Sequence, residues 1–137
     1  MNKYKSILLV EDDEVDVMTL KRVFRKISVD NPLYVCSDGE KALDWLGEHR
    51  KEKPGLILLD LNMPRMNGLE FLHMLKKDKD LQVIPVVVLT TSADLNDRAE
   101  SFRNNVAGYM LKSIDYQEFI LSMTVIRDYW QQSELCY

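Results

Sequence analysis

The feature of this sequence that most constrains its fold is the alternation of short apolar runs with longer segments of helical period. The apolar runs, each of strand length, are Ser6 to Val10, Leu33 to Cys36, Leu56 to Leu59, Val86 to Leu89 and Gly108 to Leu111. The segments with apolar residues at helical spacings are Val15 to Ile27, Glu40 to Glu48, Leu69 to Lys76, Asn96 to Asn104 and Tyr116 to Trp130. This alternation is typical of βα units around a parallel sheet.

The apolar runs also indicate how the sheet is covered. Most of them are continuous in apolarity rather than alternating, which predicts strands with helices on both faces and a buried sheet. Right-handed crossovers leave few topologies for such units. We therefore predict an α/β fold with a doubly wound, five-stranded parallel sheet of flavodoxin type, in three α/β/α layers.

Length and charge limit what the chain does. A chain of 137 residues fits one domain, residues 1–137, and we expect a short tail after about residue 130. The net charge of −4 comes from mixed charges without a basic stripe, so nucleic-acid binding is not expected. The apolar run near the start is too short for a signal peptide or a membrane span, and neither Cys36 nor Cys136 suggests a disulfide or metal cluster. We expect a cytoplasmic protein without membrane contact.

Polar residues that can bind a metal or take part in a reaction follow the predicted strands. In order along the chain they are Glu11, Asp12 and Asp13, then Asp60, then Thr90, Thr91 and Ser92, then Lys112. In an open α/β sheet the ligand site lies at the carboxyl ends of the strands, so these side chains are expected at one rim. Two carboxylates about 4 Å apart repel by about 4 kcal/mol at an effective dielectric near 20, so a cation is needed among them. Mg²⁺ suits such an oxygen-only site, and Lys112 adds a positive charge.

Each of these residues has an ordinary interpretation when it is taken alone. An aspartate at a strand end is usually a cap or turn residue, threonine is common in strands, and lysine is usually a solvated surface charge. The functional interpretation depends on their joint placement at successive strand ends.

From Ile7 to about Trp130 the chain resembles the two-component response-regulator receivers. The segment LLVEDD is similar to the acidic metal-binding pair of that family, which implies that Glu11 and Asp12 bind the metal. The segment LLDLNMPRMNG is similar to the phosphoacceptor loop, which implies that Asp60 is the nucleophile and also a metal ligand. In the same loop, the backbone carbonyl of Asn62 would be offered to the metal.

The resemblance extends to three further positions. Thr90 falls on the hydroxyl position of the family, Tyr109 on the switch aromatic and Lys112 on the lysine. Phosphoryl transfer needs a carboxylate nucleophile, a metal that bridges the oxygens, and donors to the migrating group. Asp60, Mg²⁺, Lys112 and Thr90 would fill these roles.

The sequence departs from the family after the lysine. Receivers usually have proline there, often after a cis bond, whereas this chain has Ser113. A cis bond without proline costs roughly 2.5–4 kcal/mol, which leaves two arrangements open: a trans bond, or a cis bond held by its neighbours. The Lys-Ser pair, the segment NPLYVCSDGEKALDWL and the ending IRDYW resemble the small regulators of phytochrome-type kinases.

The resemblance implies a switch rather than an enzyme. A histidine kinase would donate a phosphoryl group to Asp60, with at most slow self-dephosphorylation. Thr90 would then move inward with Tyr109, and the signal would leave by protein contacts. A rival is a phosphatase of the haloacid dehalogenase type, but that pattern needs a general-acid aspartate where Asn62 stands. A second rival is a pseudo-receiver scaffold, which the filled acidic and basic positions weaken.

The last predicted helix carries more apolar residues than one face needs. A stripe for the sheet is formed by Phe119, Ile120, Met123, Ile126 and Trp130, while Tyr116, Leu121, Val125 and Tyr129 fall largely outside it. Such a spread predicts an interface, most simply a homodimer through this helix. The alternative is a broad core face with scattered exposed side chains.

Overall fold

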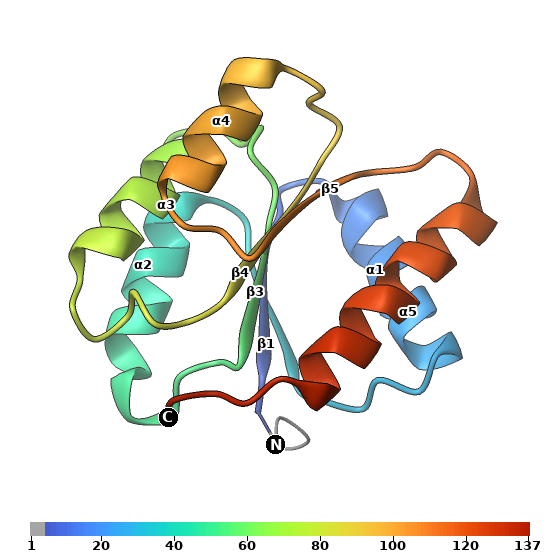
Figure 1. Ribbon diagram of the computed structural model, residues 1–137, viewed down its shortest axis with the longest axis horizontal. Helices are drawn as coiled ribbons and strands as arrows, with labels where there is room; N and C mark the ends of the chain where they lie inside the picture. The colour runs from blue at the N-terminus through green and yellow to red at the C-terminus, as the bar shows by residue number, and fades with distance from the viewer. Residues whose placement is uncertain (1–4) are drawn as a thin grey trace.

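The computed structural model describes residues 5–137 and contains one sheet of parallel strands in the order β2-β1-β3-β4-β5 (Figure 1). The strands are β1 (Ile7–Val10), β2 (Leu33–Cys36), β3 (Leu56–Leu59), β4 (Val86–Thr90) and β5 (Gly108–Leu111). The helices are α1 (Glu14–Lys26), α2 (Gly39–Glu48), α3 (Gly68–Lys77), α4 (Leu95–Arg103) and α5 (Tyr116–Gln132), with a short 3₁₀ turn, η1 (Arg50–Glu52). This is the predicted doubly wound fold.

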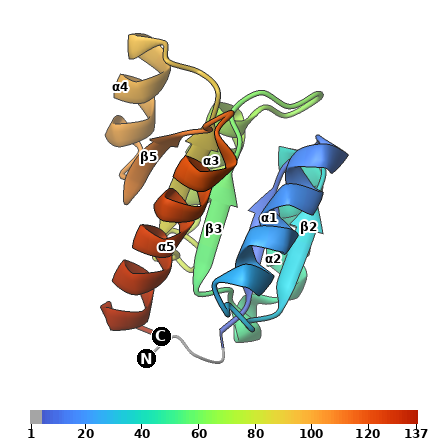
Figure 2. The ribbon, with the colours of Figure 1, turned by 90° about the vertical axis from the view of Figure 1, so that its right-hand side faces the viewer.

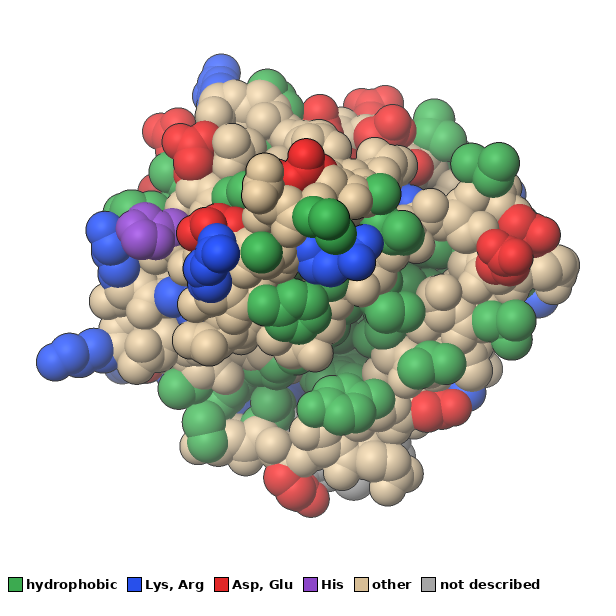
Figure 3. Space-filling view, turned by 45° about the horizontal axis from the view of Figure 1, so that its top comes forward, with side chains coloured by type: hydrophobic (Ala, Val, Ile, Leu, Met, Phe, Trp, Pro, Cys, Tyr) green, Lys and Arg blue, Asp and Glu red, His purple; other side chains and the backbone are tan. Residues whose placement is uncertain are grey.

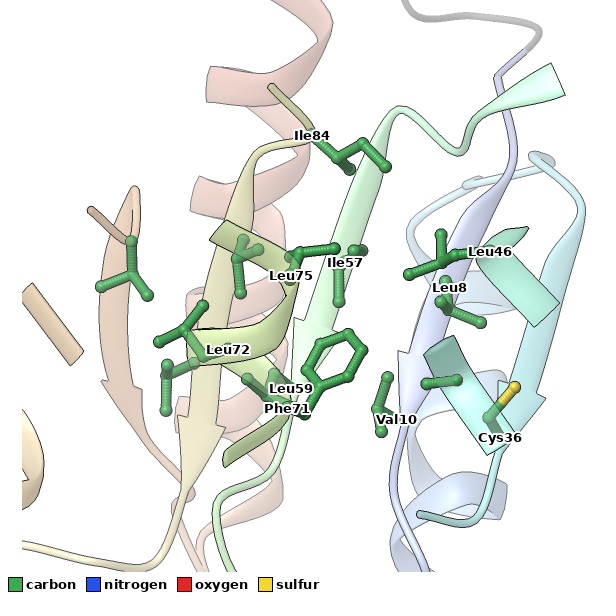
Figure 4. Close-up of a cluster of buried hydrophobic side chains, with 14 of the residues drawn as sticks. Leu8, Val10, Cys36, Leu46, Ile57, Leu59, Phe71, Leu72, Leu75 and Ile84 are labelled. Atoms are coloured by element: carbon green, nitrogen blue, oxygen red, sulfur yellow. The ribbon is translucent and has the colours of Figure 1, made fainter. Parts of the chain in front are cut away.

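The helices cover the sheet from both sides. Helices α1 and α5 lie on one face and α2, α3 and α4 on the other (Figures 1 and 2). On the second face, Leu8, Val10, Leu59 and Phe71 belong to one buried cluster (Figure 4). On the first face, α1 and α5 contribute to a separate cluster around Leu58. The two clusters make the core of a three-layer molecule.

The hydrogen-bond ladder of the sheet continues into the residues that follow the strands. The Glu11 amide donates to the Cys36 carbonyl at 3.0 Å, and the Asp60 amide donates to the Val10 carbonyl at 3.0 Å. At the other side, the Lys112 amide donates to the Thr90 carbonyl at 2.8 Å. The backbone of these three residues is therefore fixed by the sheet itself, which brings their side chains to a common rim, the carboxyl-end rim.

Within residues 5–137, each α-helix follows a residue whose side chain caps it. The Asp13 carboxylate accepts hydrogen bonds from the first amides of α1, and Asp38, Asp94 and Asp115 do the same for α2, α4 and α5. Asn67 caps α3 in a capping box with Glu70. Short polar side chains at these positions satisfy amides that would otherwise lack partners. Of the three acids after β1, Asp13 is thus occupied as a cap.

The predicted boundaries of the helices and strands are confirmed to within two residues. Two predictions about burial are corrected. The sheet is not buried throughout: Tyr34 and Val35 of β2 are exposed, as is Leu111 of β5, because these strands are the sheet edges. In α5, Tyr116 packs against the core although the helical stripe left it outside, whereas Leu121 is exposed as predicted. The helix ends at Gln132 rather than Trp130, so the tail begins two residues later.

The tail crosses from α5 beneath the sheet to the opposite helical layer (Figure 1). Near its start, the Trp130 indole donates to the Gly55 carbonyl at 2.9 Å. At its end, the Tyr137 hydroxyl donates to the Pro54 carbonyl at 2.6 Å, and the ring packs against the cluster around Phe71. The tail closes the amino-end rim of the sheet, opposite the carboxyl-end rim.

Two further expectations concern the whole chain. No peptide bond among residues 5–137 is cis, so the bond between Lys112 and Ser113 is trans. Among these residues, no helix has the length and apolarity needed to span a bilayer.

Candidate functional site

Three carboxylates meet at the carboxyl-end rim. Oxygen atoms of Glu11, Asp12 and Asp60 all lie within 4.8 Å of one another. Glu11 and Asp60 are 4% and 6% exposed, whereas Asp12 is exposed. Two buried carboxylates and one open to solvent make a site that a small cation can reach from outside.

Lys112 extends from the end of β5 into this group of acids. Its ammonium nitrogen lies 2.5 Å from Glu11 Oε1 and 2.7 Å from Asp16 Oδ2, and 3.6 Å from Asp60 Oδ2. The side chain is only 13% exposed, so the charge contacts are shielded from water. The lysine lies nearer to Glu11 and Asp16 than to Asp60.

The protonation of Glu11 reflects this crowding. The pKa of Glu11 is raised to about 7, because burial and the neighbouring charge of Asp60 raise it by more than the hydrogen bond and the charge of Lys112 lower it. The pKa of Lys112 also lies above its ordinary value: burial lowers it, but the hydrogen bonds to Asp16 and Glu11 and the charge of Asp60 outweigh burial. The buried carboxylates therefore need positive charge beside them.

One oxygen of Asp60 lacks a partner. Asp60 Oδ1 is buried and, within residues 5–137, makes no hydrogen bond to any protein group. An orphaned buried carboxylate oxygen is costly unless a ligand or ion meets it. Beside two further carboxylates, it fits a hard divalent cation with oxygen ligands, such as Mg²⁺.

The loop after Asp60 is held close to the site by glycine. A Cβ at Gly68 would lie 2.4 Å from the Asp60 carbonyl oxygen and 2.6 Å from Leu61 Cα, so no larger residue fits there. The Gly68 amide donates to the Leu61 carbonyl at 3.0 Å, which closes the loop. Asn62 lies between these ends and is exposed.

Thr90 and Tyr109 meet at a common neighbour. Thr90 is fully buried, and its hydroxyl oxygen accepts a hydrogen bond from the Ser92 amide at 3.3 Å. The Tyr109 hydroxyl donates to the Ser92 carbonyl at 2.8 Å, while its ring lies 5.8 Å from the Arg98 guanidinium. Both residues thus contact the loop between β4 and α4.

The rim therefore unites Glu11, Asp12, Asp60, Thr90 and Lys112, as the order of strand ends predicts. Sequence reasoning missed Asp16, which lies in the first turn of α1 and contacts Lys112. Its only signal was an acidic residue four positions after Asp12. Such a residue is also common in helices where it merely favours the dipole.

Comparison with known proteins gives a consistent match. The sequence model of the response regulator receiver domain matches residues 7–124. Response regulator Rcp1 of Synechocystis is 37% identical over 136 residues, covering 96% of this chain and 92% of Rcp1. The probable methanogenesis regulatory protein FilR2 of Methanothrix harundinacea is 35% identical over 127 residues, covering 90% of this chain and 82% of FilR2.

Solved structures agree with the sequence matches. The phosphorylated cyanobacterial phytochrome response regulator RcpA has a TM-score of 0.90 at 32% identity, covering 98% of this chain and 99% of that one. The Mn²⁺-bound form of Rcp1 has a TM-score of 0.87 at 36% identity, covering 97% and 99%. With its flavodoxin-like fold and its acidic rim, the chain belongs to the response regulator receiver family and is a phosphoacceptor switch of the two-component type.

Proposed function

We propose that Asp60 is the phosphoacceptor of this receiver and that its donor is the phosphohistidine of a sensor histidine kinase. The observation that carries the proposal is the buried Asp60 Oδ1, which has no hydrogen-bond partner in residues 5–137 and lies in a carboxylate whose other oxygen faces Lys112. In the reaction a carboxylate oxygen of Asp60 forms a bond to phosphorus as the bond between phosphorus and the histidine nitrogen breaks.

The neighbouring residues would stabilise the group in transit. Lys112 supplies a positive charge and N–H donors for the phosphoryl oxygens, and the Thr90 hydroxyl can donate to the same group. Lys112 is 13% exposed and Thr90 is buried, so their contacts would not be weakened by bulk water. We therefore expect the chain to accept a phosphoryl group, with at most slow self-dephosphorylation and without turnover of other phosphoesters.

Mg²⁺ is the metal that we propose for this site. Carboxylate oxygens of Glu11, Asp12 and Asp60 would hold it together with the backbone carbonyl of Asn62. The support is the set of oxygen atoms within 4.8 Å and the exposure of Asp12, which leaves room for waters. When bound, the ion would neutralise the carboxylates and the negative charge of the phosphoryl oxygens. Rcp1 is known in a Mn²⁺-bound form, which supports a divalent ion in such a receiver.

A phytochrome-type kinase is the partner that we propose. RcpA is a cyanobacterial phytochrome response regulator, and this chain is 32% identical to it over nearly its full length. The exchange would take place in the cytoplasm, where histidine kinases use ATP and where Cys36 and Cys136 stay reduced as free thiols. Residues 1–137 would act as a single receiver domain whose output is a protein contact.

Thr90 and Tyr109 are the switch residues in this proposal. A phosphoryl group on Asp60 would offer the Thr90 hydroxyl a strong acceptor and draw it away from the Ser92 amide. Because Tyr109 bonds to the carbonyl of the same Ser92, its hydrogen bond would change with the loop. The shift would then reach β5, which contains Tyr109, and α4, whose Arg98 lies over the Tyr109 ring.

The surface of α5 is where we propose that two copies meet. Leu121, Val125 and Tyr129 are 65%, 62% and 64% exposed on this helix. An apolar groove of about 300 Å³ lies beside them, lined in part by Met110 and Leu135. Figure 3 shows hydrophobic side chains around a hollow on this side of the molecule. A two-fold axis would bring each patch against its own copy.

Phosphorylation is tested by intact-mass spectrometry with a small-molecule phosphodonor or with beryllofluoride. The wild type is expected to gain one phosphoryl group, or bind one beryllofluoride, only with a divalent metal, and Asp60→Asn is expected to gain none. Asp128→Asn, an exposed aspartate of α5, is the matched control and should behave as the wild type. Labelling of Asp60→Asn at the wild-type level would overturn the assignment.

The dimer is tested by sedimentation with and without beryllofluoride. We expect self-association of the wild type and its loss in the Val125→Glu, Tyr129→Glu double mutant. Met74→Glu with Val83→Glu changes two exposed apolar residues elsewhere, so it is the matched control and should not weaken association. A wild type that stays monomeric at high micromolar concentration in both states would contradict the dimer.

A further inference from the structure

The contact between Asp16 and Lys112 joins the start of α1 to the end of β5. Asp16 lies in the first turn of α1, where its amide is held by the capping Asp13 carboxylate at 3.2 Å. Lys112 directly follows β5, and its amide is held by the Thr90 carbonyl at 2.8 Å. With both backbones fixed, the 2.7 Å contact between the two side chains is a defined bridge rather than a chance meeting of mobile charges.

The bridge draws the lysine away from the phosphoacceptor. The ammonium has three N–H donors. Two of them have close acceptors in Glu11 at 2.5 Å and Asp16 at 2.7 Å, whereas the nearest Asp60 oxygen is 3.6 Å away. The lysine that should neutralise charge on Asp60 is therefore held mainly by its other two neighbours.

There is space behind the lysine for it to take this position. A cavity of about 50 Å³ lies between α1 and α5, lined by Glu11, Asp16 and Lys112 on its polar side. Leu20 and Phe119 are among the apolar residues that line the rest. The ammonium thus has room on the Asp16 side of the site, while it already lies 3.6 Å from the nearest Asp60 oxygen.

We propose that Asp16 is a positioning residue that competes with the phosphoryl group on Asp60 for the ammonium of Lys112. This inference rests on the proposed role of Asp60. When Glu11 serves a metal ion, two acceptors are left for the lysine: the Asp16 carboxylate and the phosphoryl oxygens. Each contact that Lys112 keeps with Asp16 weakens its hold on the phosphoryl group, so Asp16 sets how firmly the phosphorylated state is held.

The competition predicts a gain when Asp16 loses its charge. In Asp16→Asn, the lysine is released toward Asp60, and the protein should bind beryllofluoride more tightly at saturating Mg²⁺. The affinity for beryllofluoride should rise about two- to fivefold, because Asp16 is 40% exposed and ion pairs of exposed groups are weak. Loss of the phosphoryl group should slow by a similar factor, and Asp16→Glu should restore wild-type behaviour.

Isothermal titration with beryllofluoride, in wild-type protein and variants, tests this. Glu14→Gln is the matched control: it removes the same charge from the same helical turn, and it should leave affinity within error of the wild type. The sharper control is Lys112→Ala, in which Asp16→Asn should add no further change. A purely electrostatic effect of Asp16 on the bound anion would persist in that background, and would overturn the proposal.

The outcomes separate this inference from the proposed function. If the wild type binds no beryllofluoride at all, the role of Asp60 fails, and the inference falls with it. If the wild type binds it and Asp16→Asn binds it equally or less tightly, only the positioning role of Asp16 is overturned. Tighter binding by Asp16→Asn that requires Lys112 supports the proposal.

Discussion

The two rims of the sheet differ in how completely their polar groups are paired. At the carboxyl-end rim, Asp60 Oδ1 is buried without a hydrogen bond, and two buried carboxylates lie close to each other. At the amino-end rim, Trp130 and Tyr137 both donate to backbone carbonyls, and Arg50 makes ion pairs with Asp78 and Asp80. One rim keeps groups free for a ligand, while the other joins polar groups of the protein to each other.

This difference places the residues that stabilise the fold at the amino-end rim and the proposed phosphoacceptor site at the carboxyl-end rim. Unpaired polar groups in a buried site cost stability, so such a site depends on structure elsewhere to hold it. Here the closed amino-end rim lies at the opposite ends of the same strands. We expect substitutions at the amino-end rim to lower the free energy of unfolding and to spare phosphorylation, and those at the carboxyl-end rim to do the reverse.

The largest expected effect is on stability, at Trp130. This residue is 3% exposed, fills the core beneath α5 and donates to Gly55, so Trp130→Ala should lower the free energy of unfolding by about 3–5 kcal/mol. Urea unfolding followed by circular dichroism measures it. Beryllofluoride binding by the folded fraction should remain at the wild-type level, since the site lies at the other rim.

Gln131→Ala, an exposed neighbour, is the control for Trp130 and should change the free energy by less than about 0.5 kcal/mol. If Trp130→Ala does not fold, Trp130→Phe gives the same comparison with a smaller loss. A Trp130 variant that is folded but no longer binds beryllofluoride would break the separation between the rims.

The next effect is on metal binding, at Asp12. Asp12→Asn removes a carboxylate from the crowded site, so the protein in chelator should melt at the same temperature as the wild type or up to about 3 °C higher. Mg²⁺ should raise the melting temperature of the wild type and have little effect on the mutant. Thermal melts in chelator and in Mg²⁺ measure both quantities.

Asp115→Asn serves as a control for Asp12, because Asp115 caps α5 away from the metal ligands and an asparagine can keep the cap. Its response to Mg²⁺ should equal that of the wild type. The prediction fails if Asp12→Asn is less stable in chelator and yet responds fully to Mg²⁺.

A smaller effect is expected from the tail. Tyr137→Phe removes the hydroxyl that donates to the Pro54 carbonyl, while the ring keeps its packing against the core. The free energy of unfolding should fall by about 1 kcal/mol, the net value of one hydrogen bond. Tyr129→Phe, with a ring that is 64% exposed, is the control and should be nearly neutral. Equal stability of the two variants in urea would show that the tail does not hold the amino-end rim.

The smallest effect concerns the two thiols. Burial raises the pKa of Cys36 to about 11, so at pH 8 only about one molecule in a thousand carries the thiolate there. Cys136 is exposed and should react first with iodoacetamide, with Cys36 reacting mainly after unfolding in urea. Peptide mapping by mass spectrometry identifies the labelled thiol. Rapid labelling of Cys36 in the native protein would mean that β2 opens easily.

The parts that sequence reasoning predicted are those that depend on local pattern and on the geometry of parallel strands. Glu11, Asp60 and Lys112 each directly follow an apolar run, and the backbone ladder of the sheet continues into all three. Their meeting at one rim therefore follows from the strand boundaries alone. The helix boundaries are also set by local pattern, because the helices begin at polar capping residues, and they were predicted to within two residues.

The parts that could not be predicted depend on how distant elements pack. Asp16 reaches Lys112 across a sequence separation of 96 residues, and no local pattern in the sequence predicts that contact. The exposure of β2 and β5 required the strand order, which places both at the edges. The path of the tail required knowledge of Pro54, its partner at a sequence separation of 83 residues.

The closing of the amino-end rim by the tail also bears on how the protein can be handled. The ammonium of Lys5 lies 5.1 Å from the centre of the Tyr137 ring, so the first described residue and the last one are neighbours at this rim. A linker joined after Tyr137 would anchor the molecule to a sensor chip or a fluorescent reporter with its phosphoacceptor side turned toward solution. A kinase flowed over such a chip would meet Asp60 without passing the support.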